Sequence, residues 1–442
     1  MVDNAGGTTI VPTINILGGS AVSFTGSNVG GDLVLTAVRS NPFSNVSGDS
    51  NTNAAGAALE SAGAGATGDM LNVLSALDAL GSNQARADSI QTMTPDVSSG
   101  ALQGSRSLNS HFLTAISNRL SFARSGFASP ASGIATGDMV QGMGFWMQGL
   151  GSHAKQGERG GIQGYNANTF GTTMGFDNLL NEHVRMGLAG VYGFGAINAK
   201  TAGSPSDNIN SFQGTVYGSY DSVNLCQARQ DRKYSRTAVR NQAERLWYVD
   251  GMLSFTQNNY DSRREVFVGA EKRVAKADHS GQQYSTQFET GYTLLFEKTR
   301  DLEVTPFASL GYNYLYMNKY KEKGADALDL SVRGKGFNQL EQGLGLKFAY
   351  PMLSREGTFI PSIKGAWLFD YITDKFETTA SFAGGGSSFS TVGCNPARNA
   401  FLLGTELAFL NKGNMTLTGN FDWMLRDAYA SYTYYLTLRY DF

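Results

Sequence analysis

From Gly144 to its end, the chain repeats a single pattern, in which apolar side chains alternate with small or polar ones at strict period two. After Val184, for example, Met186, Leu188, Tyr192 and Phe194 alternate with Arg185, Gly187, Ala189 and Gly193. Because successive side chains of a β-strand point to opposite faces, this pattern predicts strands with one apolar face and one small or polar face. The same alternation returns in the segments 284–296, 340–350 and 415–423.

Twelve such segments can be counted, beginning near Gly144, Tyr165, Val184, Asn210, Trp247, Gln282, Leu302, Gly336, Thr358, Asn399, Met415 and Ala430. Most of their connections alternate in length. Short connections at 178–183, 297–301, 351–357 and 410–414 separate long polar ones near 151–164, 258–280, 317–335 and 373–398. An even number of strands with short turns on one side and long loops on the other is typical of bacterial outer-membrane barrels. The pattern predicts an all-β fold for 143–442, a 12-stranded antiparallel transmembrane β-barrel.

The composition fits this fold but does not single it out. The chain has 54 Gly, 20 Tyr and 26 Phe, which a barrel with aromatic girdles needs and which a soluble β-sandwich could share. The net charge of -2 gives no reason to expect a nucleic-acid partner. No run of about 18 apolar residues occurs, so no membrane-spanning helix is expected. The start of the chain lacks the basic and apolar regions of a signal peptide, so we expect a piece of a longer precursor.

The first hundred residues have a different character. Strands are expected at 8–17 and 31–40, and residues 1–45 as a whole are too short to bury a core, so they are interpreted as the end of a larger β-structure. Residues 46–101 are interpreted as a helical linker. Asp69 is expected to cap one helix, and a second helix is expected from 83 to 93, where Pro95 stops it.

A third helix is predicted for residues 102–125. Its apolar stripe has i, i+4 spacing and consists of Leu108, Phe112, Ile116 and Leu120. At about 1.5 Å per residue the helix is roughly 34 Å long, just more than the roughly 30 Å hydrocarbon thickness of a bilayer. Two interpretations are open at this point. The pattern alone favours an amphipathic helix on a soluble domain, and the alternative is a plug threaded through the barrel.

One connection that should be short, at 223–246, is long and basic. It carries Arg229, Arg232, Lys233, Arg236, Arg240 and Arg245. A solvated helical insertion is the first interpretation, and contact with periplasmic or lipid headgroup anions is the alternative. The two cysteines, Cys226 and Cys394, fall on opposite sides of the predicted membrane, so no disulfide is expected between them.

The last strand carries a further signal. Counting back from the end in steps of two gives only apolar or aromatic side chains: Phe442, Tyr440, Leu438, Leu436 and Tyr434. Arg439 and Asp441 would face inward. A final strand that ends in Phe is similar to the signal read by the barrel assembly machinery, where an open barrel edge can accept a new strand.

The segment from Gly144 to Phe442 resembles autotransporter β-domains. The stretches that carry the resemblance are 259–263 (NYDSR), 289–292 (ETGY), 306–312 (PFASLGY) and 320–325 (YKEKGA) followed by Leu328. Residues 118–124 resemble the segment that enters the barrel in that family, and residues 30–35 resemble the last rungs of a passenger β-helix. The resemblance covers about two thirds of the chain well.

The resemblance implies type V secretion. The barrel would be a translocator that inserts in the outer membrane and mediates secretion or surface display of its own N-terminal passenger, and the third helix would remain in the pore. The pore helix would act through Leu108, Phe112, Ile116, Asn118 and Arg119. Inward Gly171, Gly175, Gly187 and Gly345 would leave room for it. The lumen would be lined by Arg185, Asp250, Glu289, Glu341, Lys347, Glu406, Asp422 and Arg439.

Expected partners follow from the same resemblance: outer-membrane lipid, the barrel assembly machinery, periplasmic chaperones and the chain's own passenger. We expect a monomer and no nucleic acid. Some family members cut themselves at an Asn pair in the pore helix, but the aligned positions here are Thr114 and Ala115, and Asn109 and Asn118 are isolated. Self-cleavage is therefore not expected, and the passenger would stay attached or be cut by a separate protease.

No catalytic constellation, metal site or cofactor site is predicted. His111, His153, His183 and His279 are scattered without metal-ligand spacing. A protease or lipase barrel would need acids and histidines clustered on outer loops, where only His153 and His279 are candidates. The alternatives to a translocator are a porin-like channel, which would not need residues 1–125, and an adhesin anchor whose binding lies in the passenger.

Overall fold

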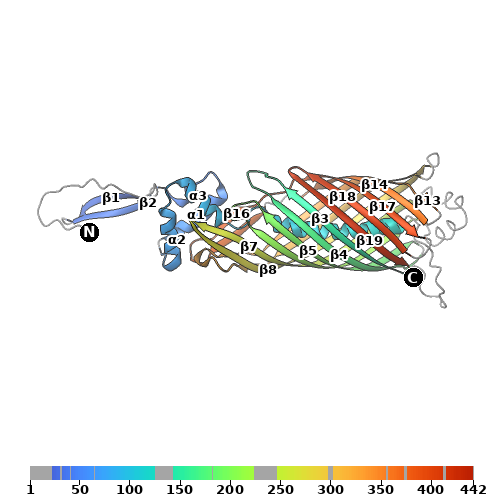
Figure 1. The fold of residues 1–442 in the computed structure, drawn as a ribbon, viewed down its shortest axis with the longest axis horizontal. Coiled ribbons are helices and arrows are strands. Elements are labelled where there is room, and N and C mark those ends of the chain that lie inside the picture. Colours follow the sequence, from blue (N-terminus) through green and yellow to red (C-terminus); the bar gives the residue numbers. More distant parts are fainter. Residues whose placement is uncertain are drawn as a thin grey trace.

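The structure is a computed structural model, which describes residues 22–29, 32–39, 41–63, 65–124, 143–181, 183–222, 246–296, 302–354, 357–372, 376–411 and 415–441. Most of these residues form a long barrel, and three helices lie at one of its ends (Figure 1). The barrel strands are β3 (Gly144–Gln156), β4 (Tyr165–Leu179), β5 (Val184–Ala199), β6 (Ser206–Asp221), β7 (Leu246–Val268), β8 (Glu271–Phe296), β9 (Leu302–Met317), β12 (Lys335–Ala349), β14 (Gly357–Asp370), β17 (Asn399–Asn411), β18 (Met415–Arg426) and β19 (Tyr429–Asp441).

These twelve antiparallel strands close on themselves. The last strand β19 pairs with the first strand β3, with Tyr435 opposite Leu150, and β12 pairs with β14 across the remaining gap. A short strand β13 (Met352–Leu353) pairs only with β14. Closure matters because hydrocarbon offers no hydrogen-bond partner to an unpaired sheet edge. The prediction of a 12-stranded antiparallel barrel is confirmed, and most strands begin within a few residues of the expected positions.

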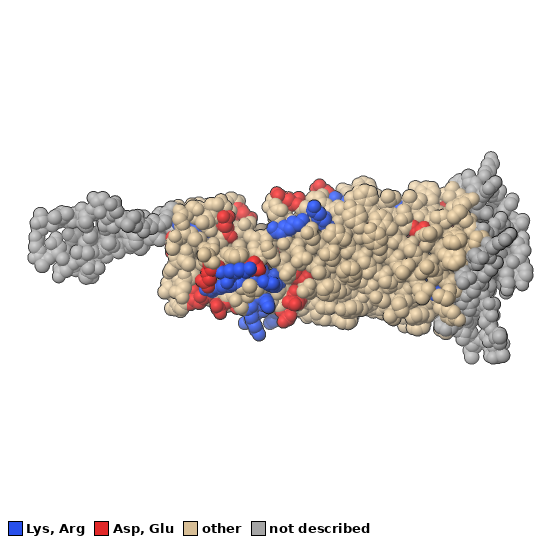
Figure 2. All heavy atoms as spheres, in the orientation of Figure 1, with Lys and Arg blue, Asp and Glu red and all other residues tan. Residues whose placement is uncertain are grey.

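The alternation of side chains sorts the barrel into two surfaces. Large apolar side chains such as Leu188, Leu253 and Phe401 are more than 60% exposed on the outside. Charged atoms are sparse over the middle of the barrel on the face seen in Figure 2. A water-soluble protein rarely exposes so large a continuous apolar surface, whereas a lipid bilayer solvates it favourably.

Two loop predictions were wrong. The segment 258–280 was expected to be an outer loop, but β7 and β8 continue as a paired hairpin through Tyr260 and His279 up to Val268 and Glu271. Likewise β3 continues to Gln156, so His153 and His279 both lie in strands. The alternation is lost in this part of β7 and β8 because neither face meets the hydrocarbon of the bilayer, although the backbone pairing continues.

The upper hairpin of β7 and β8 belongs to a small unit that we call the mouth cap. The cap comprises α1 (Ser50–Gly63), α2 (Gly68–Asp78), α3 (Asn83–Thr92), the short helices η1 (Phe43–Asn45) and η4 (Asp326–Leu328), and a four-stranded sheet of β10 (Tyr320–Lys321), β11 (Leu330–Val332), β15 (Glu377–Phe382) and β16 (Phe389–Val392). Its apolar core joins Leu59, Leu77 and Ile90 of the helices to Val266 of β7 and Phe382 of β15. Segments expected to be a linker and loops therefore pack together.

Two details of the cap helices differ from the sequence expectation. Helix α1 was not predicted, because its Asn, Ala and Gly residues lack an apolar stripe; Gly56 lies so close to the Phe43 carbonyl that a Cβ there would be 2.0 Å from its oxygen. Asp69 does not cap α2, whose N-cap is Thr67. Instead, Asp69 lies in the first turn, where Arg273 donates to both carboxylate oxygens, at 2.6 and 2.8 Å.

Before the cap lies a hairpin of β1 (Val22–Val29) and β2 (Asp32–Arg39), whose strands are antiparallel. Strand β2 was expected and β1 was not, and the strand expected at 8–17 lies outside the described residues. Arg39 at the end of β2 forms an ion pair of 2.6 Å with Asp78 of α2, which joins the hairpin to the cap.

The third predicted helix is α4 (Gly100–Arg124), and it lies inside the barrel (Figure 1). Its 25 residues rise about 37 Å. Among the described residues, no helix is both long enough and apolar enough to cross a bilayer by itself. Helix α4 is instead surrounded by the inner faces of the strands, so the sequence alternative of a plug is the one that the structure adopts.

Candidate functional site

The site is the barrel lumen, where α4 leans against one wall formed by β4, β5, β6 and β7. The apolar stripe of α4, which consists of Leu108, Phe112, Ile116 and Leu120, is at most 1% exposed. Its outer half packs with Ile197 and Ile209, and its inner half packs with Trp146 and Met252. The hydrophobic effect thus fixes which face of the helix meets the wall.

Phe112 is seated in a notch made by two glycines. Gly171 of β4 and Gly193 of β5 are directly opposite each other in the sheet. A Cβ at Gly171 would lie 2.7 Å from the Phe112 ring, and one at Gly193 would lie 2.5 Å from it. No other residue leaves this space. On the helix side, Gly104 leaves space for a side chain of the wall, because a Cβ there would lie 2.7 Å from Ile197.

The other glycines expected to make room for the helix have different neighbours. A Cβ at Gly175 would meet the Trp146 ring at 2.6 Å, and one at Gly187 would meet Tyr217 at 2.3 Å. These two glycines accommodate inward aromatic side chains of the barrel itself. Gly345 is close to Phe307 of β9 in the same way, at 2.4 Å. Gly171 meets the helix as expected, and Gly193, which the sequence analysis did not single out, meets it as well.

A buried charge cluster holds the inner half of α4. The Arg119 guanidinium lies 2.5 Å from the Asp177 carboxylate of β4, and Arg185 of β5 lies 2.6 Å from the same oxygen. The Tyr217 hydroxyl donates to the second oxygen of Asp177 at 3.1 Å and accepts from the Trp146 indole at 2.8 Å. Buried charges are tolerated when they are paired and hydrogen-bonded, and Asp177 meets both conditions.

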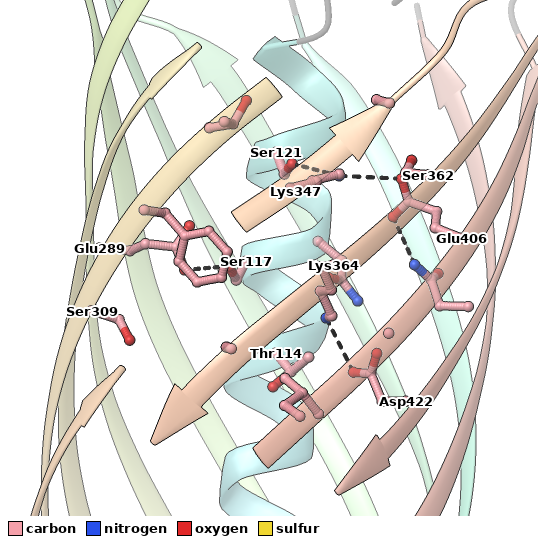
Figure 3. Close-up of a pocket in the computed structure, with 18 of the residues that line it drawn as sticks. Thr114, Ser117, Ser121, Glu289, Ser309, Lys347, Ser362, Lys364, Glu406 and Asp422 are labelled. Atoms are coloured by element: carbon pink, nitrogen blue, oxygen red, sulfur yellow. Dashed lines mark hydrogen bonds and ion pairs between the residues drawn. The ribbon is translucent and has the colours of Figure 1, made fainter. Parts of the chain in front are cut away.

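A second cluster holds the end of the helix. Arg124 donates to both oxygens of Asp250, at 2.5 and 2.7 Å, and its guanidinium stacks 3.6 Å from the ring centre of Tyr248. Tyr248 donates to Glu289 at 2.9 Å. Ser117 donates to the other oxygen of Glu289 at 3.3 Å, and Figure 3 shows that side chain reaching from the helix toward β8.

The wall opposite the helix stays polar and leaves a cavity of about 270 Å³. Here Lys347 donates to Ser121 of α4 at 3.0 Å and pairs with Glu406 at 3.3 Å (Figure 3). Beside it, Lys364 pairs with Asp422 at 3.1 Å. Six carboxylates and four cationic side chains line this cavity, so these two ion pairs neutralise only part of its charge.

The outer half of α4 is held at the barrel mouth. The Ser105 hydroxyl and the Tyr260 hydroxyl of β7 are 2.8 Å apart, and Arg106 donates to the carbonyl of Asn338 at 2.9 Å. The Arg106 guanidinium also lies 5.2 Å from the centre of the Phe376 ring. The helix is therefore attached along its whole length, at the mouth as well as at the inner end.

The structure places the predicted residues as follows. Leu108, Phe112 and Ile116 are in the apolar contact, Arg119 is in the Asp177 cluster, and Asn118 lines the cavity. Inward positions on the strands are held by Arg185, Asp250, Glu289, Glu341, Lys347, Glu406, Asp422 and Arg439. Glu341 pairs with Arg426 at 2.9 Å.

Sequence reasoning missed two partners in the lumen: Asp177, which is the centre of the inner cluster, and Lys364, which pairs with Asp422. Each is a charged residue at an inward position of a predicted strand, so the alternation could have found them.

The predicted assembly signal lies on the outside of the barrel seam. Tyr434, Leu436, Leu438 and Tyr440 of β19 are 44–60% exposed toward lipid. Phe442 lies outside the described residues, as do Cys226 and the basic insertion at 223–245. Cys394 is buried as a free thiol in the mouth region.

Comparison with known proteins decides the family. The family model described as autotransporter beta-domain matches residues 145–422, which is more than half of the chain. This chain belongs to the autotransporter β-domain family. The chain is 25% identical over 256 residues to outer membrane protein A of Rickettsia rickettsii, covering 57% of this chain and 10% of that protein. It is 22% identical over 324 residues to outer membrane protein B of Rickettsia conorii, covering 71% of this chain and 18% of that protein.

A solved structure gives the same fold. The translocator domain of the autotransporter NalP from Neisseria meningitidis superposes with a TM-score of 0.53 at 16% identity, covering 76% of this chain and 98% of that one. The autotransporter chain described here is thus an outer-membrane translocator for passenger secretion, and a porin-like channel is not favoured. It spans less than a fifth of the two Rickettsia proteins.

Proposed function

We propose that α4 is the segment that joins the passenger to the barrel and that stays in the lumen once the passenger has reached the cell surface. Residues 1–45 would then be the end of the passenger, the mouth cap would lie outside the cell, and residues 102–125 would be the pore-spanning segment. This assignment depends on the direction in which α4 runs through the barrel.

The direction follows from contacts at the end of the barrel where β3 begins. Gly144, the first residue of β3, pairs with Asp177, which precedes the short turn between β4 and β5. Arg119 contacts the same Asp177, so the C-terminal part of α4 lies at the end with short turns. Short turns face the periplasm in outer-membrane barrels. The chain upstream of Gly100 therefore emerges at the opposite, extracellular mouth.

The observation that carries the proposal is the attachment of α4 to the wall along its length. An apolar stripe, a glycine notch and two charge clusters act on the same helix, and all of them are internal to the barrel. A barrel that served as an open channel would not need an inward-facing notch for one aromatic side chain. The fold of the family itself indicates transport rather than catalysis.

The last strand supports a second part of the proposal, that Tyr434, Leu436, Leu438, Tyr440 and Phe442 form the assembly signal. Strand β19 pairs with both β18 and β3, so it forms the seam at which the barrel closes. Until it closes, its edge can pair with another strand. We propose that the barrel assembly machinery binds there and that periplasmic chaperones deliver the unfolded chain.

A surface-display assay tests the proposal. A signal peptide and a small folded tag are placed before Met1, the protein is expressed in a Gram-negative host, and protease is added to intact cells. The proposal expects loss of the tag while the barrel stays heat-modifiable on a gel. Deleting Phe442 should abolish both. A folded barrel with the tag protected in the periplasm would contradict the proposed direction of α4.

A further inference from the structure

The outer face of the barrel carries an unbalanced set of lysines directly above the lipid-facing surface of β8 and β9. We call this set the lysine ladder; it consists of Lys276 of β8, Lys321 of β10, and Lys319 and Lys323 beside β10. All four side chains are exposed. From this ladder we infer a binding surface for the phosphate groups of outer-leaflet glycolipid.

Backbone pairing forces two of these charges together. Lys276 and Lys323 form an antiparallel bridge in which each amide donates to the carbonyl of the other at 2.9 Å. Directly opposite residues in such a pair have Cα atoms about 5.5 Å apart, and like charges in this arrangement destabilise a sheet. The arrangement is favourable only if a counter-charge is supplied.

The described part of the chain supplies too little counter-charge. Within it, no carboxylate oxygen lies within 4.0 Å of any of the four ammonium groups. Two carboxylates are near on the same outer face, Asp261 and Asp278, which oppose each other in the β7–β8 pairing. By contrast, Lys272 at the hairpin tip pairs with Glu265 at 2.7 Å, and Lys335 pairs with Glu377 at 3.3 Å.

The ladder begins at the depth of the lipid headgroups. Below it on the outward face of β9 are Tyr312, Tyr314 and Tyr316, and Tyr284 pairs with Tyr314 on β8. Aromatic side chains of outer-membrane barrels form girdles at the membrane interface. Lys319 follows Tyr316 by three residues and so lies just outside the girdle. Lys276 lies eight residues beyond Tyr284, about 26 Å along β8, so the ladder extends outward from the girdle.

Figure 2 shows basic side chains, with acidic ones among them, gathered over the outer ends of β7 and β8, next to a barrel belt with few charges. The extracellular leaflet is the one that this end of the barrel meets, because the short turns lie at the other end. Basic clusters at a membrane surface attract anionic lipid. A phosphorylated glycolipid headgroup can satisfy several lysines at once, which a dispersed counter-ion cannot.

The experiment uses the full chain in zwitterionic phosphatidylcholine nanodiscs that contain either bisphosphorylated lipid A or the same lipid without phosphates. Lipid retained on the affinity-purified protein is measured by mass spectrometry. The test variant is K276Q/K319Q/K321Q/K323Q. The control is K155Q/K200Q/K272Q/K335Q, which removes the same charge from other lysines. Heat-modifiability shows that each variant is folded.

The wild type and the control are expected to retain the bisphosphorylated lipid at least about tenfold better than the phosphate-free lipid, and added salt should weaken this preference. The test variant should lose the preference. Equal retention of the two lipids by the wild type would overturn the inference. Equal loss in both variants would also overturn it, because the effect would then belong to total charge and not to the ladder.

Discussion

Arg119 of the lumen helix and Asp177 of β4 form an ion pair of 2.5 Å whose side chains are at most 2% exposed. The pair lies at the end of the barrel with short turns, where β3 begins and the first short turn follows. It therefore ties the helix to the barrel at the point where the chain must pass from one to the other.

Replacing Arg119 by Met is expected to destabilise the docked helix, because Asp177 stays buried and loses one of its two ion pairs, keeping the one with Arg185. Removing one partner of a buried ion pair typically costs about 3–5 kcal/mol. Because Arg185 stays paired with Asp177, we expect a loss near the lower value. The measurement is the urea midpoint of helix undocking, followed by Trp146 fluorescence in detergent. The control is Ser110→Ala, which should leave the midpoint unchanged because that side chain of α4 is exposed on the cavity. An unchanged midpoint for Arg119→Met would contradict the assignment.

Filling the notch should expel the helix without opening the barrel wall. Gly193→Val places methyl groups where the Phe112 ring lies, so conductance in planar bilayers should rise while the barrel remains heat-modifiable. The double variant Gly193→Val with Phe112→Ala should return conductance toward the wild-type value. Gly190→Val is the matched control, because no atom lies within 4 Å of a Cβ at that position. A similar rise of conductance in Gly190→Val would contradict the claim that Phe112 in the notch holds the helix in the lumen.

The apolar core of the mouth cap should control access to the outer end of the barrel. Leu77 and Ile90 are 0% exposed, and truncating either to Ala removes buried contacts worth about 2–5 kcal/mol. We expect faster protease cleavage within residues 50–93 and an unchanged barrel. Leu71→Ala is the control, since that side chain is 50% exposed. Equal cleavage rates for all variants would show that the cap is not a cooperative unit.

The pairing of Asp69 with Arg273 predicts a pH dependence of the cap. The hydrogen bond from Arg273 lowers the pKa of Asp69 below its ordinary value of 3.8. A carboxylate with a depressed pKa in the folded state contributes stability that is present above pH 3.8 and is lost as pH falls through the folded value. Hydrogen exchange of α2 should therefore accelerate below pH 3.8 in the wild type. In Asp69→Asn, the amide hydrogens of α2 should exchange faster at neutral pH, and their exchange should accelerate less below pH 3.8 than in the wild type.

Much of the barrel could be predicted because lipid and lumen impose opposite demands on alternate residues. The starts at Val184, Leu302, Asn399 and Met415 coincide with the observed strands for this reason. Where neither face meets the hydrocarbon of the bilayer, as in the segment 258–280, the alternation disappears and the strand was predicted as a loop. Helix α1 was missed because its contacts depend on small residues packed against the rest of the cap.

The lumen could be predicted only in part. Inward charges follow from the strand pattern, but their pairing depends on how α4 is rotated and which wall it touches. That orientation is set by Phe112 in the notch of Gly171 and Gly193, a contact between residues far apart in sequence. The partner of Arg119 therefore had to come from the structure.

The central claim is that α4 remains in the lumen of the surface-exposed protein with its N-terminal end outward. In a variant with Cys226 and Cys394 replaced by Ser, cysteines are introduced at Ser105 and Tyr260, whose hydroxyls are 2.8 Å apart at the mouth. A short bismaleimide added to intact cells should join them and change the gel mobility. The matched pair of Ser105 and Thr418, which is at the periplasmic end of β18, should not be joined. Cross-linking of the second pair and not the first, in a folded barrel, would contradict the account.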